Sequence, residues 1–370
     1  MVGRARRSAA ASMPSTLRRF LLASLAVLLL AAPASAYRFF GRTIDSSLAP
    51  IAEGAATWSR SAWGASRTLS WVVSEAPEWS DSFEWRGETY ESPFETASDV
   101  LPFVRSALDA WSDVRTADIR WRVAAIRANL PRARDHINAI RPHVLDVPAS
   151  YAAVYIEAGE IMECDISFSP GHTVFFGGRG QPALLHELGH CLGLAHSGMF
   201  PTWDSGVFPP AAGAVWPQDP KMSYGYDRDH RLTHDDIIGG SLLRPARGFR
   251  HGAIEGGVRF AEASAPFVRL VASRIGADGR LAESVSVFSD EKGRYRFEGL
   301  APGDYLLAAG PMMESSAHGS LLDAGAVLHG AEDRYLLAPV GVSLGASTRA
   351  PPIVLREGRA SAVRLREEPE

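Results

Sequence analysis

The segment from His186 to His196 constrains this chain more than any other part of its sequence. It reads HELGHCLGLAH. On a helix, His186 and His190 lie about one turn apart and project from one face, so both imidazoles can bind the same ion. Gly193 allows the helix to end at a positive φ and the chain to turn back. The spacing therefore predicts a helix, a glycine turn and a metal site completed by His196.

The residues between the histidines favour a catalytic zinc site over a closed structural one. Three neutral imidazoles at about 2.0 to 2.1 Å leave the fourth position of a tetrahedral zinc ion for water. Glu187 follows the first histidine and can act as the general base for that water. An adhesion or binding protein with a structural or degenerate zinc site is the alternative, but zinc binding alone would not need Glu187. We expect one catalytic Zn²⁺ held by His186, His190 and His196; structural Ca²⁺ or a second Zn²⁺ is not predicted either way.

With the residues that follow it, this segment resembles the zinc signature of the metzincin metallopeptidases. In that family a methionine turn lies beneath the histidines, and KMSYGY at 221–226 is similar to it, with Met222 at the methionine position. Tyr224 resembles the astacin and serralysin tyrosine that stabilises the oxyanion, whereas LTHDDIIG at 232–239 is similar to the matrixin branch. The resemblance implies an α+β fold class, with a twisted mixed sheet, a long helix and a zinc-site helix, and a matrixin-like secreted endopeptidase.

Several of these residues also have a structural interpretation. A lone methionine such as Met222 is commonly core filler, and Tyr224 can cover the core with its hydroxyl in water. Thr233 followed by Asp236 predicts a helix N-cap with acidic residues in the first turn. We favour that interpretation over a catalytic pair formed by Asp235 and Asp236.

The chain has two cysteines, Cys164 and Cys191. Cys191 directly follows His190, so on a helix it points about 100° away from it, toward the apolar face. Cys164 lies in an alternating run at 162–168 that predicts a strand. If this strand packs beneath the helix, a disulfide can form; two buried free thiols are the alternative.

The N-terminal residues predict export. Several arginines precede an apolar run at 20–32, and Ala-Ser-Ala at 34–36 is a signal-peptidase signature. The run has about 13 residues, fewer than the roughly 20 that span a bilayer, so we favour a cleaved signal peptide over an uncleaved anchor. We expect a signal peptide at 1–36, a leader at 37–67, and a secreted or periplasmic mature protein without a stable membrane span.

The sequence pattern changes near residue 246. Residues 68–73 alternate like a strand and residues 98–113 have helical spacing, as expected before a zinc helix. Beyond 247, short β-type runs are broken by turns, and GRYRFEGLAPGDYLL at 293–307 resembles the carboxypeptidase regulatory-like, transthyretin-like β-sandwich. We predict a peptidase domain at 68–246 and a C-terminal all-β sandwich at 247–370, with an insertion at 311–352. The sandwich could support the catalytic domain or serve adhesion.

Composition is that of a globular protein without affinity for polyanions. Hydrophobic residues make up 46% of the chain, charged residues 22%, and the net charge is −4. We therefore expect no nucleic-acid partner. The family resemblance implies a protein or peptide substrate bound as an added strand at a sheet edge; the oligomeric state is not predicted.

Overall fold

The fold is described from a computed structural model of the chain. The structure describes residues 55–59, 68–85, 87–128, 130, 134–142, 150–170, 181–197, 220–222, 231–266, 268–290, 292–310, 334–336 and 338–356. All of them belong to one compact unit, Ala34–Glu370. The signal peptide predicted at 1–36 and most of the leader predicted at 37–67 lie outside these residues, so the structure does not test them.

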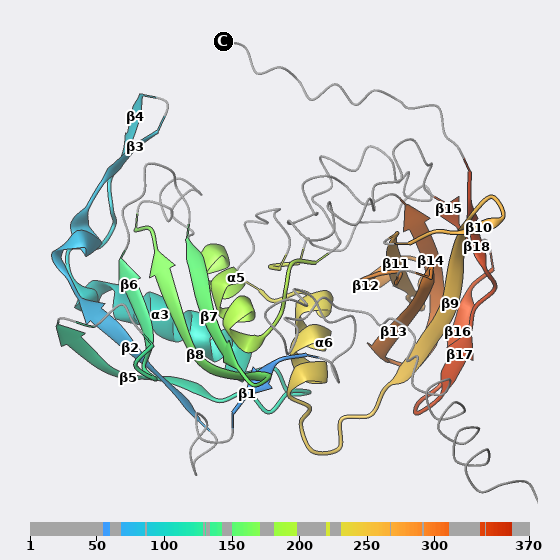
Figure 1. Ribbon diagram of the computed structural model, residues 1–370, viewed down its shortest axis with the longest axis horizontal. Coiled ribbons are helices and arrows are strands. Elements are labelled where there is room, and N and C mark those ends of the chain that lie inside the picture. The colour runs from blue at the N-terminus through green and yellow to red at the C-terminus, as the bar shows by residue number, and fades with distance from the viewer. Residues whose placement is uncertain are drawn as a thin grey trace, which may run out of the picture. The chain divides into compact units, whose positions relative to one another are not determined.

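The first half of the described chain forms a six-stranded sheet (Figure 1). Its strands are β1 (Thr57–Trp58), β2 (Leu69–Glu75), β5 (Trp121–Ala128), β6 (Asn138–Pro142), β7 (Tyr151–Glu157) and β8 (Glu160–Phe168). The order β1-β8-β6-β2-β5 is parallel throughout. By contrast, β7 runs antiparallel to β8. A 3₁₀ helix, η2 (Pro77–Ser80), and a hairpin of β3 (Phe83–Trp85) and β4 (Glu88–Tyr90) follow β2.

Two helices pack against this sheet and against each other. They are α3 (Ala97–Ser112) and α5 (Gln181–Leu192). A capping box between Thr96 and Asp99 begins α3, so the first N–H groups of the helix are satisfied locally. Its buried side chains recur at helical spacing and form one apolar face: Val100, Val104, Leu108 and Trp111. The long helix expected at 98–113 is therefore confirmed as an element.

The second half of the described chain forms two five-stranded sheets. The first has the order β10-β9-β13, with β17 and β18 also paired to β9; the second has the order β12-β11-β14-β15, with β16 paired to β14. The strands are β9 (Gly252–Phe260), β10 (Ala263–Ser264), β11 (Arg269–Ile275), β12 (Leu281–Phe288), β13 (Arg294–Leu300), β14 (Gly303–Gly310), β15 (Arg334–Tyr335), β16 (Val340–Val342), β17 (Ser347–Arg349) and β18 (Ile353–Leu355). Alternating side chains such as Tyr295 and Phe297 are fully buried, as in two sheets packed face to face.

The helix α6 (His234–Leu243) contacts elements from both halves of the chain. It packs on α5 and also on β12 and β13 of the sandwich. Gly240 lies close to the Trp111 ring, and the absence of a side chain at Gly299 on β13 leaves room for Ile238. Because α6 fills space between the two halves, a single hydrophobic core runs through both.

The predicted fold class is wrong. We expected α+β with a metzincin-type catalytic domain, but the described residues are β-dominated, with strands β1 to β18 against three α-helices and one 3₁₀ helix, and with sheets of the β-sandwich type. The error has a physical cause. The expected class was carried over from one short motif, which specifies a ligand geometry, whereas strands of five to nine residues dominate the chain on both sides of that motif.

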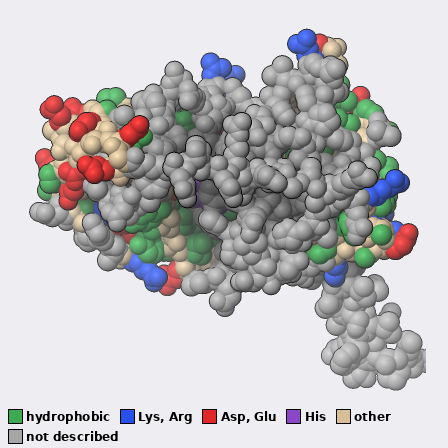
Figure 2. Space-filling view, turned by 90° about the horizontal axis from the view of Figure 1, so that it is seen from above, with side chains coloured by type: hydrophobic (Ala, Val, Ile, Leu, Met, Phe, Trp, Pro, Cys, Tyr) green, Lys and Arg blue, Asp and Glu red, His purple; other side chains and the backbone are tan. Residues whose placement is uncertain are grey.

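The surface carries an acidic area. Exposed carboxylates of η2 and the β3–β4 hairpin gather there, as the red side chains in Figure 2 show. They include Glu78, Asp81, Glu84, Glu88 and Glu91. Among the residues described, no helix has the length and apolar character needed to cross a membrane.

Candidate metal centre

The helix that carries the first two histidines ends in a glycine turn. Gly193 has φ 114°, a value that strains any residue with a side chain. Its N–H donates to the carbonyl of His190 at 2.9 Å, and the N–H of Leu194 donates to the carbonyl of Gly189 at 3.0 Å. This pair of bonds is a Schellman motif. The turn redirects the chain, so His196 returns toward the helix rather than continuing along its axis.

The turn brings the three predicted histidines together. Nε2 of His186 lies 3.0 Å from Nε2 of His190 and 3.2 Å from Nε2 of His196. Within the described ranges these three residues are the only group of His, Cys, Asp or Glu side chains arranged to hold a metal ion, with ligand atoms within 4.8 Å of one another. The histidine cluster is thus a site that could bind a metal.

Hydrogen bonds orient two of the imidazoles. Nδ1 of His186 donates to the carbonyl of Lys221, and Nδ1 of His190 donates to the carbonyl of Leu194 at 2.8 Å. A carbonyl can only accept, so each Nδ1 carries the proton and each Nε2 carries a lone pair. Burial also lowers the pKa of His186 to about 4, which keeps that ring neutral near pH 7.

The geometry fits a tetrahedral cation. Two lone pairs that face each other at 3.0 Å repel unless a positive charge lies between them. For metal–nitrogen bonds of about 2.0 to 2.1 Å, tetrahedral geometry places ligand nitrogens about 3.3 Å apart. The separations of 3.0 and 3.2 Å in this structure are close to that value. The donor set of three imidazoles is one that zinc accepts, together with other first-row divalent ions.

Glu187 is buried beside the cluster without being part of its ligand group. Only 6% of the residue is exposed. Burial raises the pKa of its carboxyl group to about 8, although a hydrogen bond from the backbone N–H of Ala152 on β7 acts in the opposite direction. A carboxyl group with this pKa can hold or release a proton near neutral pH, as a general acid or base must.

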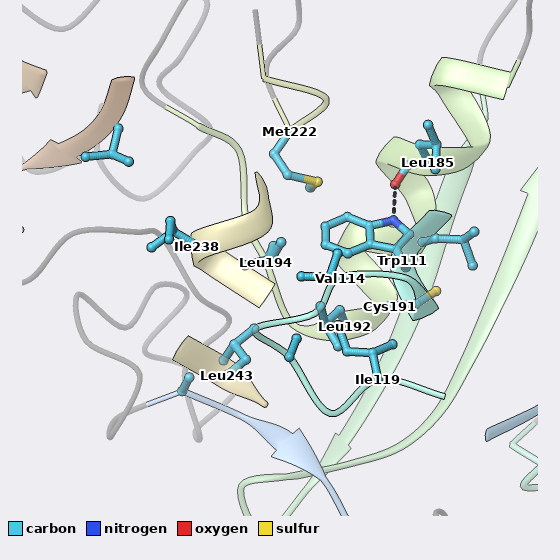
Figure 3. Close-up of a cluster of buried hydrophobic side chains, with 14 of the residues drawn as sticks. Trp111, Val114, Ile119, Leu185, Cys191, Leu192, Leu194, Met222, Ile238 and Leu243 are labelled. Atoms are coloured by element: carbon cyan, nitrogen blue, oxygen red, sulfur yellow. Dashed lines mark hydrogen bonds between the residues drawn. The ribbon is translucent and has the colours of Figure 1, made fainter. Parts of the chain in front are cut away.

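Met222 lies beneath the helix that carries the histidines. A side chain at Gly189 would collide with the sulfur of Met222, so the glycine is what allows the two to approach. Figure 3 shows Met222 beside Trp111, whose indole N–H donates to the carbonyl of Leu185 at 3.1 Å. Met222 is 2% exposed and belongs to the hydrophobic core.

Asp236 holds the segment next to the site, a role that the sequence did not indicate. Its carboxylate accepts the Thr233 N–H and Oγ–H, which completes the expected capping box of α6. It also accepts the backbone N–H groups of Lys221 and Met222 at 2.9 and 3.1 Å. Because the Lys221 carbonyl accepts from His186, Asp236 fixes the segment that orients this histidine. Only the capping pattern was visible in the sequence.

Asp235 is also buried and hydrogen-bonded. Its Oδ2 accepts the Ser197 hydroxyl at 2.7 Å and its Oδ1 accepts the Ser286 backbone N–H at 2.8 Å. Burial raises the pKa of Asp235 to about 7, and the neighbouring charge of Asp236 adds to the effect. Both aspartates are therefore held by hydrogen bonds within the protein rather than facing the histidines.

The structure joins Cys164 and Cys191 in a disulfide. Their Cα atoms lie 5.5 Å apart, within the usual range for a bridge. Cys191 lies on α5 and Cys164 on β8, so the bond ties the helix to the strand beneath it. The presence of a disulfide is consistent with export into an oxidising compartment.

Tyr224 lies outside the described residues, so its predicted role stays a prediction.

No protein-family model and no curated protein matches the chain. Solved structures with partial similarity include a minor pilin, GBS52, of Streptococcus agalactiae, at 13% identity and a TM-score of 0.18 over 30% of this chain and 45% of the pilin. A 3-chlorocatechol 1,2-dioxygenase of Rhodococcus opacus has 14% identity and a TM-score of 0.17 over 29% and 60%. The C-terminal domain of the shaft pilin SpaA of Lactobacillus rhamnosus has 10% identity and a TM-score of 0.14 over 29% and 98%. This chain thus spans only about half the length of the first two.

These comparisons overturn the expected family membership. We expected a metzincin, matrixin-like with an astacin- or serralysin-like turn, followed by a carboxypeptidase regulatory-like sandwich. No family model supports either, and the solved neighbours are pilin and dioxygenase chains. An eleven-residue motif specifies a ligand geometry but not a fold. At TM-scores this low, the pilins and the dioxygenase carry no argument about function either.

Proposed function

We propose that the protein is an exported, zinc-dependent endopeptidase. The observation that carries the proposal is the position of Glu187, a buried carboxyl group with a raised pKa, on the helix that presents two of three convergent imidazoles. A metal site needs only the histidines, so a proton-transfer group beside them supports catalysis.

In the proposed mechanism His186, His190 and His196 hold the zinc ion, which when bound would supply Lewis acidity and lower the pKa of water to about 7. Glu187 takes a proton from the attacking water and later gives it to the leaving amine. Its desolvated surroundings keep the proton affinity of this carboxyl high enough for both steps. In this proposal Tyr224 stabilises the oxyanion.

The substrate we propose is an extended protein or peptide segment. β7 pairs with β8 on one side and with no other described strand, so its second edge can accept a further strand. Ala152 of β7 donates its N–H to Glu187, which places the strand next to the proposed base. A peptide laid along β7 would therefore pass close to the site.

The compartment that the protein reaches after export is also part of the proposal. The disulfide and the N-terminal signal pattern support a secreted or periplasmic protein.

A second candidate is a surface adhesion or binding protein whose metal is structural. Burial of the ligands favours it, because His186 and His190 are 7% and 9% exposed. The β-rich sandwich also contacts the residue that follows His196, as a structural metal site between packed elements would require. In this case the metal would stabilise the fold and no substrate would be cleaved.

One experiment separates the two candidates. The mature protein is incubated with casein or gelatin, with and without a chelator, and zinc is then restored. The peptidase proposal expects cleavage that the chelator abolishes and zinc restores. Unchanged casein under all conditions, together with a fall in Tm on metal removal, would favour the structural site.

A further inference from the structure

We propose that the edge of the sandwich strand β12 positions the third histidine, through Ser286, Asp235 and Ser197. The inference rests on the metal binding of the proposed function but not on peptidase activity. β12 ends the order β12-β11-β14-β15 and pairs only with β11 among the described strands. Its outward N–H groups therefore need other acceptors. The N–H of Ser286 donates to Oδ1 of Asp235 at 2.8 Å.

Asp235 carries this contact to the residue after the third histidine. Its Oδ2 accepts the hydroxyl of Ser197 at 2.7 Å, and the hydroxyls of Ser197 and Ser286 lie 3.0 Å apart. The three residues thus form a closed ring of polar contacts, in which the backbone N–H of Ser286 provides the link to Asp235. Ser197 is 9% exposed, and Asp235 and Ser286 are each 3% exposed. Because little water can reach them, a lost bond in the ring has no solvent replacement.

His196 depends on such contacts more than the other two ligands do. His186 and His190 lie within α5, whose backbone hydrogen bonds fix their positions. The chain leaves the helix at Gly193, so the backbone at His196 is held by tertiary bonds instead. One of these is the Ser197 N–H to the Met222 carbonyl at 2.7 Å, and the Asp235 ring supplies others through the Ser197 side chain.

Ser284 provides a matched control on the same strand. It is 2% exposed, and its hydroxyl lies 2.7 Å from that of Ser273 on the neighbouring strand β11. Ser284→Ala therefore removes a buried serine contact within the sandwich but leaves the Asp235 ring intact. Any effect shared by Ser284→Ala and Ser197→Ala reflects lost stability rather than ligand positioning.

The test measures Co²⁺ binding by the full mature chain after metal removal, using a competing chelator for affinity and visible absorption for geometry. Asp235→Ala and Ser197→Ala should weaken Co²⁺ binding by about tenfold and shift the absorption bands. Asp235→Asn should bind nearly as the wild type does. Its amide oxygen can accept the Ser286 N–H, and its NH₂ can donate to the Ser197 hydroxyl. Ser284→Ala should lower Tm alone.

Wild-type affinity and spectrum in both alanine variants would overturn the inference. If Asp235→Ala does not fold, Ser197→Ala decides, because it removes a single oxygen atom. Failure of the wild-type chain to bind Co²⁺ would overturn both this inference and the proposed metal site. No arm measures peptide cleavage, so an absence of peptidase activity would not affect the result.

Discussion

The buried helices α5 and α6 both carry ionisable side chains, but their polar surroundings are opposite. On α5 and just after it, acceptor nitrogens converge on one another, with Nε2 of His186 3.0 Å from Nε2 of His190. On α6, donors converge on an acceptor, since the carboxylate of Asp236 receives three backbone N–H groups and one hydroxyl. Burial alone therefore does not identify a site. Converging acceptors can hold a cation, whereas a carboxylate with converging donors is already satisfied.

The largest expected effect concerns Glu187, which lies on α5 beside the converging histidine nitrogens. Glu187→Ala should keep about one equivalent of zinc, because the carboxyl group is not a ligand, but should lower kcat/KM by at least 10² to 10⁴. Zinc content is measured by elemental analysis and activity with a quenched fluorescent peptide. Glu187→Gln serves as the isosteric control and should behave in the same way. Retained cleavage by either pure variant would contradict the assigned base.

Removing the satisfied carboxylate on α6 should mainly affect stability. Asp236→Ala leaves buried N–H groups at Lys221, Met222 and Thr233 without their acceptor, and should lower the free energy of unfolding by about 4 kcal/mol. Urea denaturation measures the loss. Asp99→Ala is the matched control, because Asp99 forms the same capping box with Thr96 on the exposed end of α3. Equal losses of unfolding free energy in the two variants would show that the hydrogen bonds from Lys221 and Met222 to Asp236 do not contribute to stability.

Removing the disulfide tests how much the covalent link between α5 and β8 stabilises the protein. The bond closes a loop with a sequence separation of 27, for which the loop-entropy model predicts about 3 to 4 kcal/mol of stabilisation. Reduction, or Cys164→Ala with Cys191→Ala, should lower the urea midpoint by a corresponding amount. Metal affinity of the folded fraction should change little, since the bond lies on the side of α5 that faces β8. Two alkylated thiols in the unreduced, denatured protein would show that the bridge does not form.

The smallest effect expected is a change in pH dependence. Burial raises the pKa of Asp235 from its ordinary 3.8 to about 7. Between about pH 4 and 7 the folded protein therefore keeps a proton that the unfolded chain releases, so stability falls as the pH rises through this window. The asparagine in Asp235→Asn does not titrate, so this substitution should reduce the slope of the unfolding free energy against pH. Unfolding free energies at several pH values measure it; identical slopes for the two proteins would argue against the raised pKa.

Local patterns in the sequence predicted local structure well. The helix turn between His186 and His190, the turn at Gly193 and the capping box at Thr233 each depend on a few neighbouring residues, and the structure contains all three. The disulfide was left open because it depends on the distance between β8 and α5. No pattern in one strand or helix reports such a distance.

The remaining features were beyond prediction for a related reason. Asp235 accepts a backbone N–H at Ser286, and every residue except proline offers that donor, so no side-chain pattern marks the contact. The family and fold class were wrong because they were carried over from one short motif to the whole chain. Strands of five to nine residues supply most of the β structure on both sides of the motif, but the pattern within a strand does not reveal how the strands are ordered into sheets.

The close approach of Met222 to Gly189 also bears on how this protein can change over generations. A methyl group at Gly189 would occupy the place of the Met222 sulfur, so a substitution there requires the Met222 side chain to move or a smaller residue to replace it. The two positions are distant in the sequence, yet a change at one alters the space available to the other. In any set of descendants we therefore expect the residues at the two sites to vary together.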